Sequence, residues 1–163
     1  MANAREEFKK NVDLKKITTK KSKLDSIYIK QGKLICFVDA AYGNDPKRRR
    51  STTGYAFTYA GGAVVYRSKA QSITAQSSTE AEFIAAVTAA KTAIYLRSVL
   101  NELGFPQDEP TPIYEDNASA IEIINAQKPT ERSRHIEIRF FAIQDWKMKG
   151  EIKMLHIPGV INP

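Results

Sequence analysis

The sequence predicts an α/β fold in which one mixed β-sheet carries helices on its faces. Three observations support this prediction. Residues 34–42, "LICFVDAAY", are apolar at both alternations, which is typical of a strand covered on both faces. Residues 53–69 contain two β-rich runs broken by Gly61-Gly62, a hairpin signal. From Ser77 to about Leu103 the pattern becomes helical.

The ends of this long helix are marked in the sequence. Ser77 with Glu80 three residues later forms a plausible capping box, and Gly104 is a natural stop. Four further elements are expected: a short strand "PIYED", a helix from about Asn117 to Ala126, a helix from about Glu131 to Lys149, and a last strand "EIKMLHIP". The predicted order is therefore β-β-β-α-β-α-α-β.

Length and composition predict one globular domain without a membrane partner. The chain has 163 residues, of which 42% are hydrophobic and 26% charged. No apolar run approaches the roughly 18 residues that span a bilayer, and the N-terminus lacks the apolar centre of a signal peptide. We therefore expect an intracellular protein. Cys36 is the single cysteine, so a metal ion would need oxygen ligands.

The positive charge is concentrated at the N-terminus. Of 25 Lys+Arg and 18 Asp+Glu, residues 1–33 contain ten and four, which leaves fifteen and fourteen for residues 34–163. We predict a basic N-terminal arm or connection segment at 1–33 and a folded domain at 34–163. The arm is typical of nucleic-acid binding and equally of a solvated linker. A second basic cluster, "PKRRR" at 46–50, is just as ambiguous.

Three acids on apolar frames stand out as a candidate site. Asp39 lies near the end of the first strand, and Asp116 lies where "PIYED" gives way to a helix. Glu82 shares a helix face with small residues: Ala85, Ala86, Ala89 and Ala93. Burying a carboxylate costs several kcal/mol unless it is paired, and a divalent cation would remove that cost for all three. Each acid alone could equally be a cap, a turn former or an ion-pair partner.

Carboxylates without histidine or cysteine are the ligand set of a hard cation such as Mg²⁺. Two such ions about 4 Å apart support in-line displacement at a phosphodiester. The three acids together therefore predict a metal-dependent nuclease.

Six motifs carry a resemblance to a known family. They are "VDAAYGN", "RRRSTTGYAF", "VVYRSKAQSITAQSSTEAEFIAA", "PIYEDNASAI", "SRHIEIRFF" and "HIPGVINP". In order and spacing they resemble the ribonuclease H domain of a copia-class LTR retrotransposon Pol polyprotein, which follows the reverse transcriptase. The resemblance covers residues 34–163. It implies the ribonuclease H-like fold, with a mixed five-stranded sheet and no extra basic helix between the second and third helices.

The resemblance also implies roles for the acids. Asp39, Glu82 and Asp116 match the family's catalytic, metal-binding acids. Glu80 is a rival for Glu82, but Glu82 is followed by "FIAA", the setting of the catalytic Glu, whereas Glu80 has a capping explanation. Glu115 should point to the opposite face of its strand and is expected to be a bystander.

Weaker expectations concern contacts to substrate. The residues are Ser77, Ser78, Thr79, Asn117, Arg134, His135 and His156. The short polar side chains beside the acids could contact sugar hydroxyls or phosphates, although capping explains Ser77 equally well. Arg134 with His135 could touch a phosphate or simply pack locally. His156 could assist product release, although a histidine at a strand end is more often structural.

The sequence departs from the family pattern at its end. In the family a fourth acid follows "HIPGVINP" and opens a C-terminal helix, whereas this sequence ends at Pro163. We therefore expect the C-terminal helix to be missing and the second metal ion to bind more weakly.

The resemblance implies an endonuclease that cuts the RNA strand of RNA/DNA hybrids during reverse transcription and leaves a 3′-hydroxyl and a 5′-phosphate. The expected cofactor is two Mg²⁺ ions, with Mn²⁺ as a substitute. The expected partners are the hybrid and the upstream reverse transcriptase domain, in cytoplasmic virus-like particles. The alternative is a catalytically weakened module of the same fold that binds nucleic acid or tethers a polymerase. The oligomeric state is left open.

Overall fold

The computed structural model describes residues 32–126 and 137–163, and its elements follow the predicted order. The bounds are β1 Ile35–Ala41, β2 Thr52–Tyr59, β3 Gly62–Ala70, α3 Ser78–Glu102, β4 Thr111–Glu115, α4 Ala118–Asn125, α5 Glu137–Met148 and β5 Ile152–His156. The helix expected from Glu131 is described from Glu137 onward, since residues 127–136 lie outside the described residues, as does the arm to residue 31.

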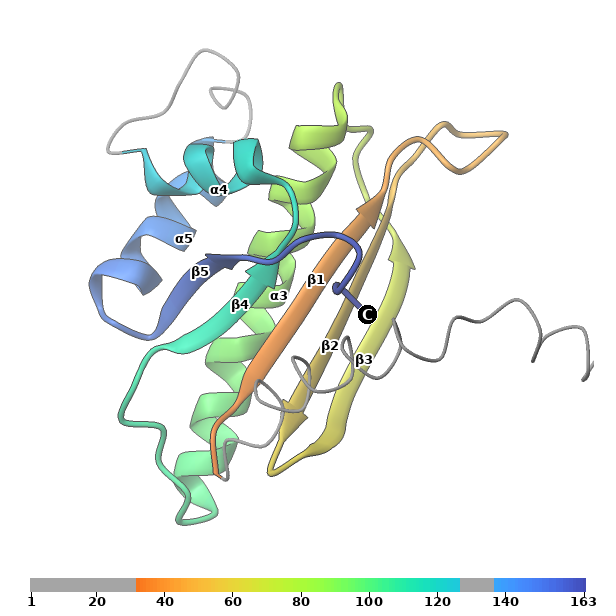
Figure 1. The fold of residues 1–163 in the computed structure, drawn as a ribbon. Helices are drawn as coiled ribbons and strands as arrows, with labels where there is room; N and C mark the ends of the chain where they lie inside the picture. Colours follow the sequence, from red (N-terminus) through yellow and green to blue (C-terminus); the bar gives the residue numbers. More distant parts are fainter. Residues whose placement is uncertain (1–31, 127–136) are drawn as a thin grey trace, which may run out of the picture.

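The strands form one mixed five-stranded sheet in the order β3-β2-β1-β4-β5 (Figure 1). The pairs β1–β2 and β2–β3 are antiparallel, whereas β1–β4 and β4–β5 are parallel. The helix α3 connects β3 at one edge to β4 inside the sheet, and it packs across β1. The mixed sheet that the sequence predicts is thus confirmed.

The main core lies between the sheet and the helices. Leu34, just before β1, and Cys36 and Val38 of β1 point into it, and the alanine-rich face of α3 packs against them. Phe140 and Ile143 of α5, which packs against α3 and β5, belong to the same core. By length and composition α3 could cross a membrane, but its apolar face is buried against the sheet, which accounts for that composition. The small side chains let α3 approach the sheet closely.

The opposite face of β1 has a smaller apolar cluster. Ile35 and Phe37 point to this side and pack with Ile157, while Tyr114 and Ile161 cover them in part. The chain after β5 therefore crosses in front of β1, where Figure 1 shows its end. Asn162 fastens it there, because its Nδ2 donates to the carbonyl oxygen of Val38 at 3.0 Å. The strand is covered on both faces, as its sequence predicts, by helices on one side and by this segment on the other.

The caps of α3 follow the sequence signals with one change. Ser77 is the N-cap, and its Oγ accepts from the backbone N–H of Glu80 at 3.1 Å. The carboxylate of Glu80 accepts from the N–H of Gln76 at 2.8 Å, one residue before the position that a capping box requires. After the helix, Gly104 has a φ of +83°, which favours glycine.

The β2–β3 turn lies one residue earlier than predicted. Tyr59 pairs with Gly62, so the two turn residues are Ala60 and Gly61, and Gly62 begins β3. Both turn residues have positive φ, 51° for Ala60 and 83° for Gly61. A two-residue hairpin needs this backbone to match the twist of its strands. The prediction of Gly61-Gly62 as the turn is therefore wrong by one position.

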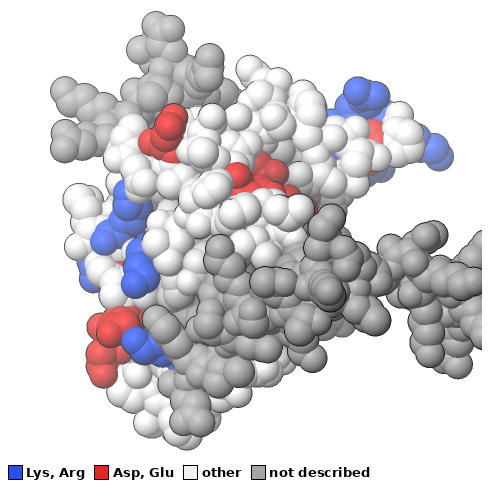
Figure 2. Space-filling view, viewed as in Figure 1, with Lys and Arg blue, Asp and Glu red and all other residues white. Residues whose placement is uncertain are grey.

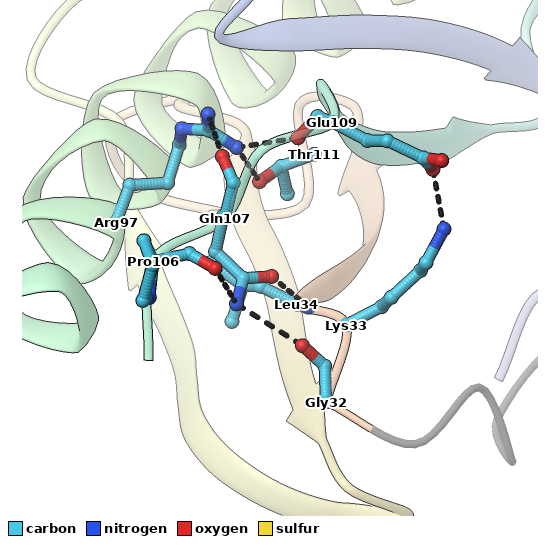
Figure 3. Close-up of polar contacts among 8 residues, drawn as sticks. All are labelled: Gly32, Lys33, Leu34, Arg97, Pro106, Gln107, Glu109 and Thr111. Atoms are coloured by element: carbon cyan, nitrogen blue, oxygen red, sulfur yellow. Dashed lines mark hydrogen bonds and ion pairs between the residues drawn. The ribbon is translucent and has the colours of Figure 1, made fainter. Parts of the chain in front are cut away.

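A polar network fastens the start of the sheet to the end of α3 (Figure 3). The guanidinium of Arg97 donates to the carbonyl oxygens of Gln107 and Glu109, at 2.6 and 2.8 Å, and to Thr111 Oγ1 at 3.1 Å. The Gln107 side chain accepts from the N–H of Leu34 at 2.8 Å and donates to the carbonyl oxygen of Gly32 at 3.0 Å. This network fixes where β1 and β4 begin.

Candidate metal centre

Asp39, Glu82 and Asp116 come together at the end of the sheet opposite this network. One carboxylate oxygen from each residue lies within 4.8 Å of the others. Asp39 is exposed, Asp116 is partly buried and Glu82 is 7% exposed. Figure 2 shows acidic side chains gathered near the upper centre of this face.

The parallel pairing of β1 with β4 explains why the two aspartates meet. The register places Cys36 beside Ile113 and Phe37 beside Tyr114. Continuing it for two more residues along both strands brings Asp39 level with Asp116. Parallel strands end at the same edge of a sheet, so the two side chains converge. Glu82 reaches them from the second turn of α3, which packs across β1.

The position of Glu82 is electrostatically costly. Burial raises the pKa of its carboxyl to about 9, and the neighbouring charges of Glu115, Asp39 and Asp116 add to this shift. A backbone hydrogen bond from Ala40 opposes it. Among the described residues, Glu82 Oε2 is buried without a hydrogen-bond partner. A buried acceptor in this state costs about 1–3 kcal/mol, so the site favours a positive charge at this oxygen.

Glu115, which the sequence suggests is a bystander, is a buried neighbour of the three acids. Its side chain is fully buried, with Oε1 accepting from the N–H of Asn117 at 3.0 Å and Oε2 lacking a partner among the described residues. Burial raises its pKa to about 8, with smaller contributions from Asp116 and Asp39, while the N–H of Asn117 opposes the shift. It is outside the three-oxygen group. Nevertheless its charge is one of the causes that raise the pKa of Glu82.

The residues present fit a hard divalent cation. All three carboxylates supply oxygen ligands, which Mg²⁺ and Mn²⁺ accept, and their mutual repulsion is relieved by positive charge. The unpartnered Oε2 of Glu82 gives this fit a second, independent support. Glu80, the rival in sequence, accepts from Gln76 and is outside the group. Glu82 is therefore the glutamate that the structure brings to the two aspartates.

The remaining sequence candidates divide into caps and neighbours. Ser77 caps α3, and Asn117 caps α4 by accepting from the N–H of Ala120 at 3.0 Å. Ser78 is exposed in the first turn of α3 and Thr79 is half-buried there. The Nε2 of His156, an exposed residue, lies 3.1 Å from the carbonyl oxygen of Asp116, so the tautomer with the proton on Nε2 donates to it. Arg134 and His135 lie outside the described residues.

Gly159 belongs to the surroundings of the site and is absent from the sequence-based candidates. A Cβ added to Gly159 would lie 2.7 Å from Asp116 Oδ2. The segment after β5 therefore lies directly against one of the three carboxylates. The sequence has no local signal for this contact, because it joins two segments that are far apart along the chain.

A separate cleft of about 390 Å³ lies at the other end of the sheet. It is lined by the starts of β1 and β4 and by the loop at Pro106–Pro110. A nucleic-acid duplex about 20 Å wide does not fit a cleft of this volume, and the three acids are outside it. We therefore place the candidate chemistry at the three acids and not in the cleft.

Comparisons with known sequences place these features in a family context. No protein-family model matches the chain. The Pol polyprotein of transposon TNT 1-94 from Nicotiana tabacum is 39% identical over 127 residues, 78% of this chain and 10% of the polyprotein. The Pol polyprotein of transposon RE1 from Arabidopsis thaliana is 28% identical over 80% of this chain and 9% of its own length. The chain thus spans about a tenth of these relatives. A secreted effector protein of Plasmopara viticola is 45% identical over 64 residues, 39% of this chain and 45% of the effector.

Solved structures agree on the fold. Ribonuclease H1 LC11, isolated from compost, superposes with a TM-score of 0.61 at 18% identity, covering 81% of this chain and 89% of that one. The protease–reverse transcriptase of prototype foamy virus superposes with a TM-score of 0.51 at 18% identity, covering 78% of this chain and 17% of that one. The chain therefore has the ribonuclease H fold and belongs, as a homologue of one segment, to the Pol polyproteins of copia-type retrotransposons.

Proposed function

We propose that this chain hydrolyses the RNA strand of RNA/DNA hybrids in a divalent-metal-dependent reaction. The observation that carries the proposal is the convergence of Asp39, Glu82 and Asp116 at the ends of two parallel strands. The fold of ribonuclease H1 and homology to retrotransposon polyproteins support it. A structure of ribonuclease H1 LC11 in complex with an RNA/DNA hybrid superposes with a TM-score of 0.57.

The three acids would have distinct roles in this reaction. When bound, divalent cations would polarise the scissile phosphate and lower the pKa of the attacking water. Asp39, the most exposed carboxylate, would hold the cations on the solvent side, and Glu82 and Asp116 would hold them from the protein side. Binding of a cation would change the protonation of Glu82 most, because a pKa of about 9 leaves its carboxyl protonated at neutral pH without a cation.

Selection of a hybrid would depend on groups next to the acids. Ser78 and Thr79 lie in the first turn of α3, three to four residues before Glu82, and their hydroxyl groups could contact 2′-hydroxyls. His156 would lie beside the reacting phosphate because it contacts the backbone of Asp116. We further propose the reverse transcriptase segment of the same polyprotein as a partner, in cytoplasmic particles.

The deciding experiment is cleavage of a hybrid whose RNA strand is labelled at its 5′ end, with Mg²⁺ and with Mn²⁺. Asp39→Asn removes one charge and keeps the shape, so we expect loss of at least 100-fold in rate. Asp108→Asn, at the far end of the sheet, is the matched control and should retain the full rate. Equal rates for wild type and Asp39→Asn would overturn the proposal.

A second candidate is a module that binds nucleic acid without cleaving it. The similarity to a secreted effector over 64 residues favours it, because part of this sequence recurs outside a polyprotein. The same assay separates the two functions: binding of the hybrid with no cleavage in either metal would support the second candidate.

A further inference from the structure

The loop between β1 and β2 carries four consecutive cations, Lys47 to Arg50, that the proposed chemistry does not use. Lys47, Arg48 and Arg49 are exposed, and Arg50 is half-buried. Among the described parts of the chain none of the four makes an ion pair. Figure 2 shows them projecting at the upper right, beyond the acidic group. The charge of Asp45 attracts Arg48 and Arg50, but one carboxylate balances only part of four positive charges, and the remaining charge is available to a ligand.

The backbone of this loop is fixed by Asp45. Its Oδ1 accepts from the N–H groups of Lys47 and Arg48, at 2.9 and 3.1 Å. Its carbonyl oxygen accepts from the N–H of Arg49 at 2.8 Å, and its own N–H donates to the carbonyl oxygen of Arg50 at 3.1 Å. The two side-chain bonds also lower the pKa of Asp45. The cations are therefore presented on an ordered turn.

Three further bonds fasten the base of the loop. Ser51 Oγ accepts from the N–H of Gly43 at 3.0 Å, and Thr52 Oγ1 donates to Asn44 Oδ1 at 2.9 Å. The hydroxyl of Tyr42 donates to the carbonyl oxygen of Gln76 at 3.3 Å. This last bond ties the loop to the segment that leads into α3 and Glu82.

The loop lies at the same end of the sheet as the acids. It begins directly after β1, whose last residues include Asp39, and Asp39 is paired with Gly54 on the returning strand. A duplex that places one phosphate at the carboxylates would extend past this end of the sheet in both directions. The loop that carries Lys47 to Arg50 leaves the sheet at this end, between β1 and β2 (Figure 1).

We infer that Lys47, Arg48 and Arg49 bind backbone phosphates of the nucleic acid on the β2 side of the metal centre. Guanidinium groups match phosphate oxygens in a bidentate geometry, and an ordered loop loses less entropy on binding than a free one. The inference rests on the proposed function for the kind of ligand, but binding is measurable without cleavage. An acidic protein surface would also attract these cations and is treated as an outcome of the test.

The test measures affinity for a fluorescent RNA/DNA hybrid in chelator at several salt concentrations. The variant Lys47→Gln/Arg48→Gln is compared with Lys91→Gln/Lys153→Gln, which removes the same charge from exposed positions on α3 and β5. Each lost phosphate contact reduces the slope of log affinity against log salt by about 0.7–0.9. We expect the loop variant to lower the slope by about 1.5 and the affinity by about 10-fold, and the control to change neither beyond 2-fold.

A second pair of variants tests the ordered turn. Asp45→Asn and Asp45→Ala remove the same negative charge, but the amide oxygen of Asn can still accept from Lys47 and Arg48, whereas Ala cannot. We expect Asp45→Ala to bind the hybrid at least 3-fold more weakly than Asp45→Asn. Equal affinities would overturn the role of the turn.

The outcomes separate this inference from the proposed function. If wild type cleaves the hybrid and the loop variant matches its control, the inference fails and the function stands. If wild type binds without cleaving and the loop variant binds more weakly, the function fails and the inference stands. Absence of hybrid binding by wild type overturns the inference and leaves an acidic protein as the partner of the loop.

Discussion

Gly159 is the described glycine at which an added methyl group would meet one of the three acids. Its added Cβ would lie 2.7 Å from Asp116 Oδ2, so Gly159→Ala must displace either this carboxylate or the segment after β5. We expect cleavage to fall about 100-fold, as for other displacements of about 1 Å in an active site. Gly62→Ala is the control, because its Cβ would be 3.9 Å from the nearest atom. Hybrid cleavage by Gly159→Ala at the control's rate would contradict this prediction.

Glu82 and Glu115 make stability dependent on pH in an unusual direction. Their folded-state pKa values of about 9 and 8 lie above the ordinary value of about 4.3, so the folded state retains protons that the unfolded state releases. The unfolding free energy should therefore fall as pH rises from about 4.5 to about 9, by at most about 1.4 kcal/mol per pH unit for each group.

Thermal unfolding in chelator should show this as a lower Tm at pH 8 than at pH 5.5. Added Mn²⁺ should raise the Tm more at pH 8, because protons compete with the cation at the lower pH. Glu115→Gln cannot ionise and should flatten part of the pH dependence while retaining the response to Mn²⁺. A Tm that rises from pH 5.5 to pH 8 in chelator would refute the assignment of raised pKa values.

At this scale the sequence indicates the three acids but not their surroundings. Asp39 and Asp116 are recognisable because each ends an apolar strand, and Glu82 because it interrupts an alanine face. Glu115 follows the alternation of β4 into the buried side, where it accepts from the N–H of Asn117. The alternation gives the face to which a side chain points but not how close it comes to the three acids. The contact of Gly159 with Asp116 joins segments 43 residues apart and has no local signal.

Among the elements, the β2–β3 hairpin carries a backbone strain that can be relieved. Ala60 has a φ of 51°, a conformation that costs an L-residue about 1 kcal/mol and that Asn tolerates better. We expect Ala60→Asn, followed by Gly61, to raise the unfolding free energy by about 0.5 kcal/mol. Ala63→Asn on the adjacent strand β3 should lower it, because Asn is unfavourable in strands. Urea unfolding of both variants measures the difference, and a loss of stability in Ala60→Asn would exclude strain at this turn.

The elements themselves were predictable where caps and periodicity coincide. Ser77 and Gly104 bound α3 in sequence and in structure, and Asn117 begins α4 in both. The hairpin turn was misplaced because two adjacent glycines offer two registers, and strand pairing selects between them. Signals within one element are therefore sufficient for its ends, whereas a choice between registers needs the partner strand.

In the whole molecule, Arg97 joins α3 to the segment at residues 107–111, at the end of the sheet far from the acids. Arg97→Met removes its bonds to the carbonyl oxygens of Gln107 and Glu109 and to Thr111, and should lower the unfolding free energy by about 2 kcal/mol. Arg97→Lys should recover less than half, because an ammonium group cannot reproduce the fork. The rate at saturating hybrid should stay unchanged at 25 °C. A fall in that rate without loss of stability would contradict a purely structural role.

The order of elements and the mixed sheet could be predicted from the sequence, but the two faces could not be distinguished. All three described helices pack on one face, and the segment after β5 covers part of the other. A strand that is apolar on each side can be covered by helices on both faces, or by helices on one face and a chain segment on the other. The apolar pattern of β1 therefore does not decide between these arrangements. Long-range packing makes that choice.

The two aspartates of the candidate site come from β1 and from the end of β4, and these two strands pair over a short length. The register joins Cys36 to Ile113 and Phe37 to Tyr114, whereas β1 pairs with β2 along its full length. The N–H of Thr111 points to β5. Because successive N–H groups of a strand point to opposite neighbours, residue 112 would donate toward β1, but Pro112 has no N–H to donate. Opening this short ladder would part Asp39 from Asp116 before the core melts. Amide hydrogen exchange at Tyr114, whose N–H faces β1 by the same alternation, should therefore be faster than in β2, and a cation shared by the two aspartates should slow it.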